Sequence, residues 1–241
     1  LGFANVIDAF HVVHGGEIAV RFFHDERKDN TRGIRLADDL FILSEQYQCQ
    51  NLPSEIESRW RLVETAWELS LPRHTLTVGY DQEGELLVVN DKQFERKPIT
   101  SCRDALIGYQ KGKCFYCFSN ISVLDSADDL ADVDHFFPHV LKRHGVGDPL
   151  DGVWNLVLAC QSCNRGPEGK FAQLPGLPFL ERLHTRNNFY VDSHHPLRET
   201  LMLQTGGIEP ERRRFLQQTY RDSKELLVRN WKPKFEHEPA F

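Results

Sequence analysis

The first part of the chain carries apolar residues at the three- and four-residue intervals of an amphipathic helix. One stripe predicts a helix over residues 36–47. A second stripe predicts a helix that begins near Ser54, because Ser54 and Glu57 fit a capping box that covers free N–H groups of the first turn. The apolar positions of this second stripe are Ile56, Trp60, Val63 and Trp67. Tryptophans on one helix stripe usually pack into a core, so we assign Trp60 and Trp67 to it.

Strand-like runs follow the two helices. Residues 76–80 and 85–89 are rich in branched apolar residues and flank a polar turn, which predicts a β-hairpin. Ser101 and Asp104 form another capping-box pattern, which predicts a short helix that ends near Gly112.

Two further strands and one long helix are expected in the second half of the chain. Residues 131–135 resemble a short strand that ends in a polar pair, and residues 155–160 resemble a second strand that runs into a cysteine pair. The segment 175–178 contains two prolines and a glycine and interrupts the pattern. A final helix is predicted over residues 210–231, with apolar residues on one side.

Composition places the chain among ordinary soluble proteins. Of its 241 residues, 40% are hydrophobic and 27% are charged, which excludes a collagen-like or wholly disordered chain. No apolar run approaches the ~18 residues of a membrane span, and no signal-peptide pattern opens the chain, so we expect a cytoplasmic protein with no membrane partner. The chain starts at Leu1 and its one methionine is Met202, so we expect that the native start is missing.

Charge is distributed unevenly along the chain. The net charge of −6 argues against a general nucleic-acid coat protein, which would be basic. Residues 181–235 nevertheless carry 11 basic and 7 acidic side chains. Local fields decide binding, so this basic segment could track phosphates, or it could be a solvated helix face with ion pairs four residues apart.

Four of the six cysteines form two C-x-x-C pairs, Cys114 with Cys117 and Cys160 with Cys163. Two residues between cysteines let both sulfurs turn toward one cation, and two such pairs complete a tetrahedral thiolate site typical of structural zinc. The 42 residues between the pairs require a folded insert. Disulfides or buried free thiols are the alternatives, and the lack of a secretion signal argues against disulfides. Cys49 and Cys102 stand alone and are assigned to the core.

The insert between the pairs carries polar residues in a recognisable order. Asp134 and His135 are followed by two phenylalanines and Pro138, and Asn155 leads into the second cysteine pair, which Asn164 follows directly. The stretch of 57 residues from 114 to 170, about a quarter of the chain, resembles the HNH endonuclease family with its ββα-metal fold. Asn164 departs from the histidine that the family often has at that position.

The resemblance implies phosphodiester hydrolysis, and the chemistry gives each residue a reason. His135 would act as general base on a water molecule. Asp134 and the amide oxygen of Asn164 would hold Mg²⁺ or Mn²⁺, which prefers oxygen ligands. Asn155 would fix the loop that carries His135 through hydrogen bonds. Two basic residues, Arg165 and Lys170, could contact phosphate or be ordinary surface charges.

Each of these residues also has a simpler reading. An Asp-His pair at a strand end is usually loop chemistry, Asn155 could be a turn residue, and Asn164 could cap a helix. His139 and His144 lie in the following loop, where exposed histidines are common. His194 and His195 have nothing nearby to complete a metal set, so we favour a structural loop there.

These observations predict an α+β fold in three parts. Residues 1–99 form a mainly helical region with a β-hairpin, for scaffolding or for partner or substrate contact. Residues 100–174 form an HNH core stapled by a four-cysteine Zn²⁺ site, and residues 175–241 form a helical, locally basic extension. The expected function is a metal-dependent HNH endonuclease that cuts DNA in a bacterial defence or restriction setting, with RNA and a homo-oligomer left open. The alternatives are a non-catalytic zinc-scaffolded nucleic-acid binding module, or an effector subunit active only with a partner ATPase or guide complex.

Overall fold

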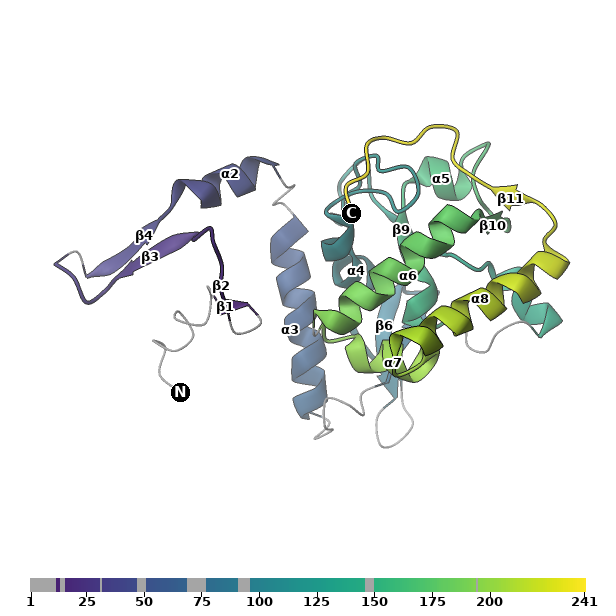
Figure 1. Ribbon diagram of the computed structural model, residues 1–241, viewed down its shortest axis with the longest axis horizontal. Coiled ribbons are helices and arrows are strands. Elements are labelled where there is room, and N and C mark those ends of the chain that lie inside the picture. The colour runs from purple at the N-terminus through teal and green to yellow at the C-terminus, as the bar shows by residue number, and fades with distance from the viewer. Residues whose placement is uncertain are drawn as a thin grey trace. The chain divides into compact units, whose positions relative to one another are not determined.

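The computed structural model describes residues 12–13, 16–30, 32–46, 51–68, 77–90, 96–145, 150–193 and 195–241. These residues form two compact units, 1–50 and 51–241, with small sheets and helices in an α+β arrangement (Figure 1). Among them, no helix has both the length and the apolar character needed to cross a membrane. Cys49 and His194 lie outside the described residues.

The first unit contains two short hairpins and one helix. Its elements are β1 (Val12–Val13), β2 (Gly16–Glu17), β3 (Phe23–Glu26), β4 (Gly33–Leu36) and α2 (Asp38–Gln46). Strand β3 pairs with β4 in antiparallel register, and α2 follows directly. The helix predicted over residues 36–47 is therefore confirmed within one or two residues at each described end, and the β3–β4 hairpin was not predicted.

The second unit opens with a helix and a three-stranded antiparallel sheet. These elements are α3 (Leu52–Glu68), β5 (Val78–Asp81), β6 (Leu86–Asn90) and β7 (Arg96–Ser101). The predicted hairpin is confirmed in β5 and β6, although residue 76 lies outside the described residues. Ile56 and Trp60 are exposed, so the assignment of Trp60 to the core is wrong. Its indole N–H donates to Glu64 one turn later, and this pairing keeps the ring on the helix surface.

Helix α4 (Cys102–Gln110) and the elements after it position the candidate site. Ser101 caps α4 by accepting a hydrogen bond from the Arg103 N–H, as the capping pattern predicted. The remaining elements are β8 (Asp132–His135), the 3₁₀ helices η3 (His139–His144) and η4 (Val153–Asn155), β9 (Leu156–Ala159), α5 (Gln161–Arg165), β10 (Leu174–Pro175), α6 (Leu177–Asp192), α7 (Arg198–Thr205), α8 (Glu209–Leu226) and β11 (Asn230–Trp231). The final helix ends at Leu226, earlier than the predicted residue 231.

The core joins the β8–β9 hairpin to the C-terminal helices. Helices α6, α7 and α8 pack against one another (Figure 1). Trp154 is fully buried, and its ring lies 4.8 Å from that of Phe215 on α8 and 5.6 Å from that of Phe137, just after β8. Aromatic packing of this kind fixes the loops at the end of the hairpin against a helical support. The compact unit also includes α3 and the three-stranded sheet, which the sequence placed with residues 1–50.

Candidate metal and catalytic site

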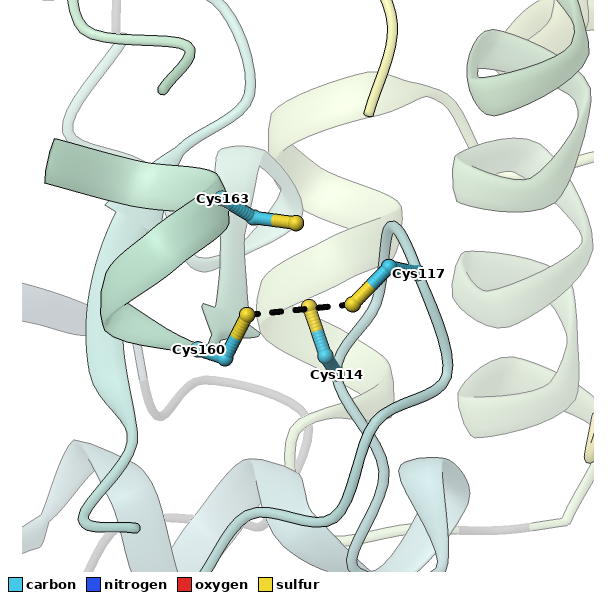
Figure 2. Close-up of side chains that lie close together, drawn as sticks. All are labelled: Cys114, Cys117, Cys160 and Cys163. Atoms are coloured by element: carbon cyan, nitrogen blue, oxygen red, sulfur yellow. Dashed lines mark hydrogen bonds between the residues drawn. The ribbon is translucent and has the colours of Figure 1, made fainter. Parts of the chain in front are cut away.

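Four cysteines are positioned to bind a metal ion such as zinc. Cys114 and Cys117 come from the turn after α4, and Cys160 and Cys163 come from the start of α5 (Figure 2). All four sulfurs lie within 4.8 Å of one another, and the sulfurs of Cys117 and Cys160 are 3.7 Å apart. A tetrahedral ion with Zn–S bonds of ~2.3 Å would separate its sulfurs by about 3.8 Å. The cysteines are free rather than disulfide-bonded.

Backbone hydrogen bonds form each cysteine turn. The Phe118 N–H donates to the Cys114 carbonyl, and Phe118 has a positive φ of 59°, which turns the chain sharply after Cys117. The N–H groups of Cys163 and Asn164 donate to the Cys160 carbonyl. The Phe115 N–H donates to the carbonyl of Leu158 on β9, so the first turn is held beside the strand that leads to the second.

Asp134 lies inside the protein in a polar network. Its carboxylate accepts hydrogen bonds from the Tyr116 hydroxyl at 2.6 Å and from the Lys170 ammonium at 3.0 Å. Burial raises the pKa of Asp134, and the charge of Lys170 and the two hydrogen bonds oppose that effect. The network therefore balances one buried negative charge with one buried positive charge.

Lys170 is fully buried and does not reach a surface where phosphate could approach. Its ammonium donates to Asp134, to the carbonyl of His135 at 2.8 Å and to the carbonyl of Phe171. Gly169 allows this course of the chain, because a Cβ at that position would lie 2.8 Å from the backbone nitrogen of Gly166. Its buried position does not suit the suggested phosphate contact, and the Lys170 side chain instead ties the loop after α5 to the end of β8.

Asn164 and Arg165 gather around a different carboxylate. The Asn164 amide donates to Asp132 at 3.0 Å, and the exposed Arg165 side chain donates to both oxygens of Asp132. Asp132 lies on the same strand as Asp134 but at its opposite end. The side chain of Asn164 is thus bonded to Asp132 and not to Asp134.

The implied Mg²⁺ does not fit the pair of Asp134 and Asn164. A second cation at Asp134 would compete directly with the Lys170 ammonium for the same buried carboxylate. Magnesium also keeps several waters, whereas Asp134 is 6% exposed.

His135 points to the other side of β8 from Asp134, because neighbouring residues of a strand alternate. It is 7% exposed, and its ring lies 5.5 Å from that of Tyr80 and 3.9 Å from that of His139. The Nε2 atom is buried and has no hydrogen-bond partner among the described residues. Burial, with a smaller effect of His139, lowers the pKa of His135 to about 3, so the ring is neutral near pH 7.

Two residues that the sequence did not assign to the site lie beside His135. Nε2 of His135 and Nε2 of His139 are each 3.6 Å from Oδ1 of Asp151. The spacing of His135 and His139, four positions apart, was a signal in the sequence. Asp151 had none, because only the folded loop brings it there. His144 is exposed, in keeping with an ordinary loop histidine.

Asn155 joins the two segments that carry these residues. Its amide oxygen accepts from the Phe137 N–H at 2.7 Å, and its amide nitrogen donates to the carbonyls of Phe137 and Leu150. Phe137 lies between His135 and His139, and Leu150 directly precedes Asp151. A fully buried Asn155 therefore holds both sides of the cluster in one geometry.

We compared the chain with protein-family models, curated proteins and solved structures. No family model, no curated protein and no solved structure matches it.

Proposed function

We propose that the chain is a metal-dependent endonuclease that hydrolyses phosphodiester bonds of DNA, and that its reaction depends on His135. The observation that carries this proposal is the unpartnered Nε2 of His135 at the end of β8. Strand β8 pairs with β9, α5 follows, and the four-cysteine cluster joins the turn before β8 to α5. This order of two strands, a helix and a metal staple is the arrangement that the resemblance to HNH endonucleases implies.

The chemistry requires a group that acts on the attacking water. A neutral imidazole has a lone pair that can either accept a proton from water or bind a cation that activates it. His135 is neutral near pH 7 and offers such a nitrogen. General-base catalysis is worth roughly 10²–10⁴-fold when the pKa of the base lies near the working pH. The pKa of His135 lies well below it, so binding a cation that activates the water is the stronger of the two roles. Four thiolates leave no open coordination position, so the cysteine-bound ion, which we take to be Zn²⁺, would hold the fold and take no part in the reaction.

The charge of helix α8 supports a nucleic-acid substrate. Arg214 and Arg221 are exposed and seven residues apart, so they lie on one helix face. Arg213 on the same helix is paired with Glu209, and Arg212 is buried and bonded to Asn188. These two arginines are therefore less available for phosphate contacts than Arg214 and Arg221. Exposed arginines on one face suit sequence-independent phosphate contacts.

The direct test is cleavage of a plasmid with added Mg²⁺, Mn²⁺ or Zn²⁺ by wild type and by His135→Ala. We expect at least a hundredfold lower rate for the variant. His144→Ala is the matched control, because His144 ends η3, a few residues further along the chain, and is exposed. Equal cleavage by wild type and His135→Ala, with both proteins folded and zinc-loaded, would contradict the proposal.

A second function is favoured by one observation. The ion pair of Asp134 with Lys170 neutralises a carboxylate that a nuclease of this type would keep open for metal. A non-catalytic module would then use the zinc scaffold to bind nucleic acid without cutting it. DNA binding by wild type with no cleavage under any of the three metals would support this alternative.

The setting of the reaction is also part of the proposal. By resemblance we place the protein in the cytoplasm of a bacterium, in defence or restriction, with a partner ATPase or guide complex that delivers the substrate. Cleavage that appears only after addition of a protein encoded beside it would distinguish an effector subunit from a self-sufficient enzyme. The same assay with RNA would test the substrate class.

A further inference from the structure

The cluster of His135, His139 and Asp151 has ligand atoms that face one another. One ligand atom from each of the three residues lies within 4.8 Å of those of the other two, and Nε2 of each histidine faces Oδ1 of Asp151. The two nitrogen–oxygen distances are both 3.6 Å. We propose that these three residues form a second metal site, separate from the four cysteines, which takes a divalent transition ion, with Zn²⁺ as the leading candidate.

The three atoms are buried and lack hydrogen-bond partners among the described residues. Leaving a buried polar group without a hydrogen bond is unfavourable, so three of them facing a common point need an explanation. A hydrogen bond between imidazole and carboxylate would be about 2.7–3.2 Å long, and 3.6 Å is too long for one. Two ligands bound at ~2.1 Å in tetrahedral geometry are about 3.4 Å apart, which agrees with the observed spacing.

The ligand types select the class of ion. Two imidazole nitrogens and one carboxylate oxygen suit zinc and its neighbours in the transition series, whereas magnesium and calcium prefer oxygen alone. Lys142 contacts Oδ2 of Asp151, which leaves Oδ1 to face the histidines. Three protein ligands also leave a coordination position open, as in catalytic zinc sites and unlike the closed four-cysteine cluster.

The fold holds the site together before any ion binds. His135 ends β8, His139 begins η3 and Asp151 precedes η4. Asn155 bonds to Phe137 on one side and to Leu150 on the other, so one buried side chain sets the spacing between the histidines and the carboxylate. Such support is what distinguishes a built metal site from a chance meeting of polar groups.

This inference rests on the proposed function only for the use of the ion. In a nuclease, the ion would activate water and neutralise phosphate charge, and His135 would be a ligand instead of a general base. Metal binding itself can be measured without nucleic acid. Extra metal without any cleavage, even after the partner protein is added, would refute the nuclease and keep the site. Cleavage that ignores His139→Ala and Asp151→Asn would refute the use of the ion in the reaction, and the metal titration alone decides whether the site exists.

The test uses the full chain with its cysteine site filled by Zn²⁺, titrated with Zn²⁺ and separately with Co²⁺, whose visible spectrum reports nitrogen and oxygen ligation. We expect two ions per chain for wild type and for His144→Ala, and one for His139→Ala. Asp151→Asn should weaken the second ion at least tenfold, and an excess of Mg²⁺ should not displace it from wild type. A single ion in wild type, or two tightly bound ions in both site variants, would overturn the proposal.

A measurement on wild type covers the case in which the variants do not fold. The His139 side chain is about one-third exposed although its Nε2 is buried, so its ring should react slowly but measurably with diethyl pyrocarbonate in protein that carries only the cysteine-bound ion. A second equivalent of Zn²⁺ should protect His139 at least tenfold while His144 stays reactive. Equal modification of His139 with and without that second equivalent would overturn the proposal.

Discussion

Replacing Lys170 with methionine would remove one half of a buried ion pair. Lys170→Met keeps the length of the side chain and deletes its charge. The Lys170 side chain is 0% exposed and that of Asp134 is 7% exposed, so water cannot replace the lost ammonium. Among the described residues, Asp134 would keep only the Tyr116 hydroxyl as a side-chain partner, and the carbonyl of His135 would lose the ammonium hydrogen bond.

The expected cost follows from the burial of the pair. Breaking a buried ion pair by removing one partner typically costs about 3–5 kcal/mol, because it leaves an uncompensated charge. For a unit of roughly this size, each kcal/mol lowers Tm by about 2–4 °C, which gives a fall of about 6–20 °C. The exposed Lys232 provides the matched control, since Lys232→Met should change stability by no more than about 0.5 kcal/mol.

Urea unfolding of the zinc-loaded chain, followed by tryptophan fluorescence, measures these free energies. The double-mutant cycle with Asp134→Asn is the sharper assay, because each single variant leaves one buried group unpaired and the double variant leaves neither charge. We expect the double variant to lose less than the sum of the single losses, with a coupling free energy of at least about 1 kcal/mol. A cost below about 1 kcal/mol for Lys170→Met, or additive losses, would refute the reasoning.

Three further predictions concern metal, acid and DNA. Cys163→Ser should lower the amount of bound zinc and reduce the near-ultraviolet circular dichroism of the zinc-loaded chain. The reason is that structural zinc contributes about 10 kcal/mol or more to folding. The control variant Ser162→Ala, on the exposed side of α5, should change neither signal. His195 is buried, and burial lowers its pKa to about 3 from an ordinary 6.5. Between these two pH values the folded chain binds fewer protons than the unfolded chain. The folded state therefore loses stability as the pH falls from about 6.5 toward 3. Between about pH 7 and 5 this group should remove about 2 kcal/mol from the free energy of unfolding, and His195→Asn should flatten that part of the urea-derived profile; equal slopes would contradict the assignment. Arg214→Gln combined with Arg221→Gln should weaken DNA binding and reduce the slope of log affinity against log salt by about 1.8, whereas an unchanged slope would remove these arginines from the interface.

Local patterns predicted the elements whose hydrogen bonds are local. The capping pattern at Ser101 correctly placed the start of α4, and the strand-like runs at residues 76–80 and 85–89 placed β5 and β6. The paired cysteines predicted two tight turns, because a C-x-x-C turn is closed by bonds within a few residues. The helices α6 and α7 were missed, since the prolines near residue 176 suggested a break, whereas Pro178 occupies the first turn of α6, where its missing N–H costs nothing.

The sequence by itself determined that the four cysteines could share one metal ion, and the tertiary structure decided which carboxylate meets which cation. The spacing of the cysteines correctly predicted that all four meet, because the two members of each pair are close in the sequence. Only one long-range contact is then needed to bring the two pairs together. In the sequence, Lys170 looks like an ordinary surface charge, and it lies 36 residues from Asp134. In the fold, the loop after α5 places its ammonium beside the Asp134 carboxylate. Asp151 likewise lies beside His135 and His139 only in the folded chain, where Asn155 bonds to the residues next to both sides of the cluster. Contacts between residues so far apart in the chain depend on packing and on the free-energy cost of leaving a buried charge or dipole unpaired. A local sequence pattern contains no information about that cost.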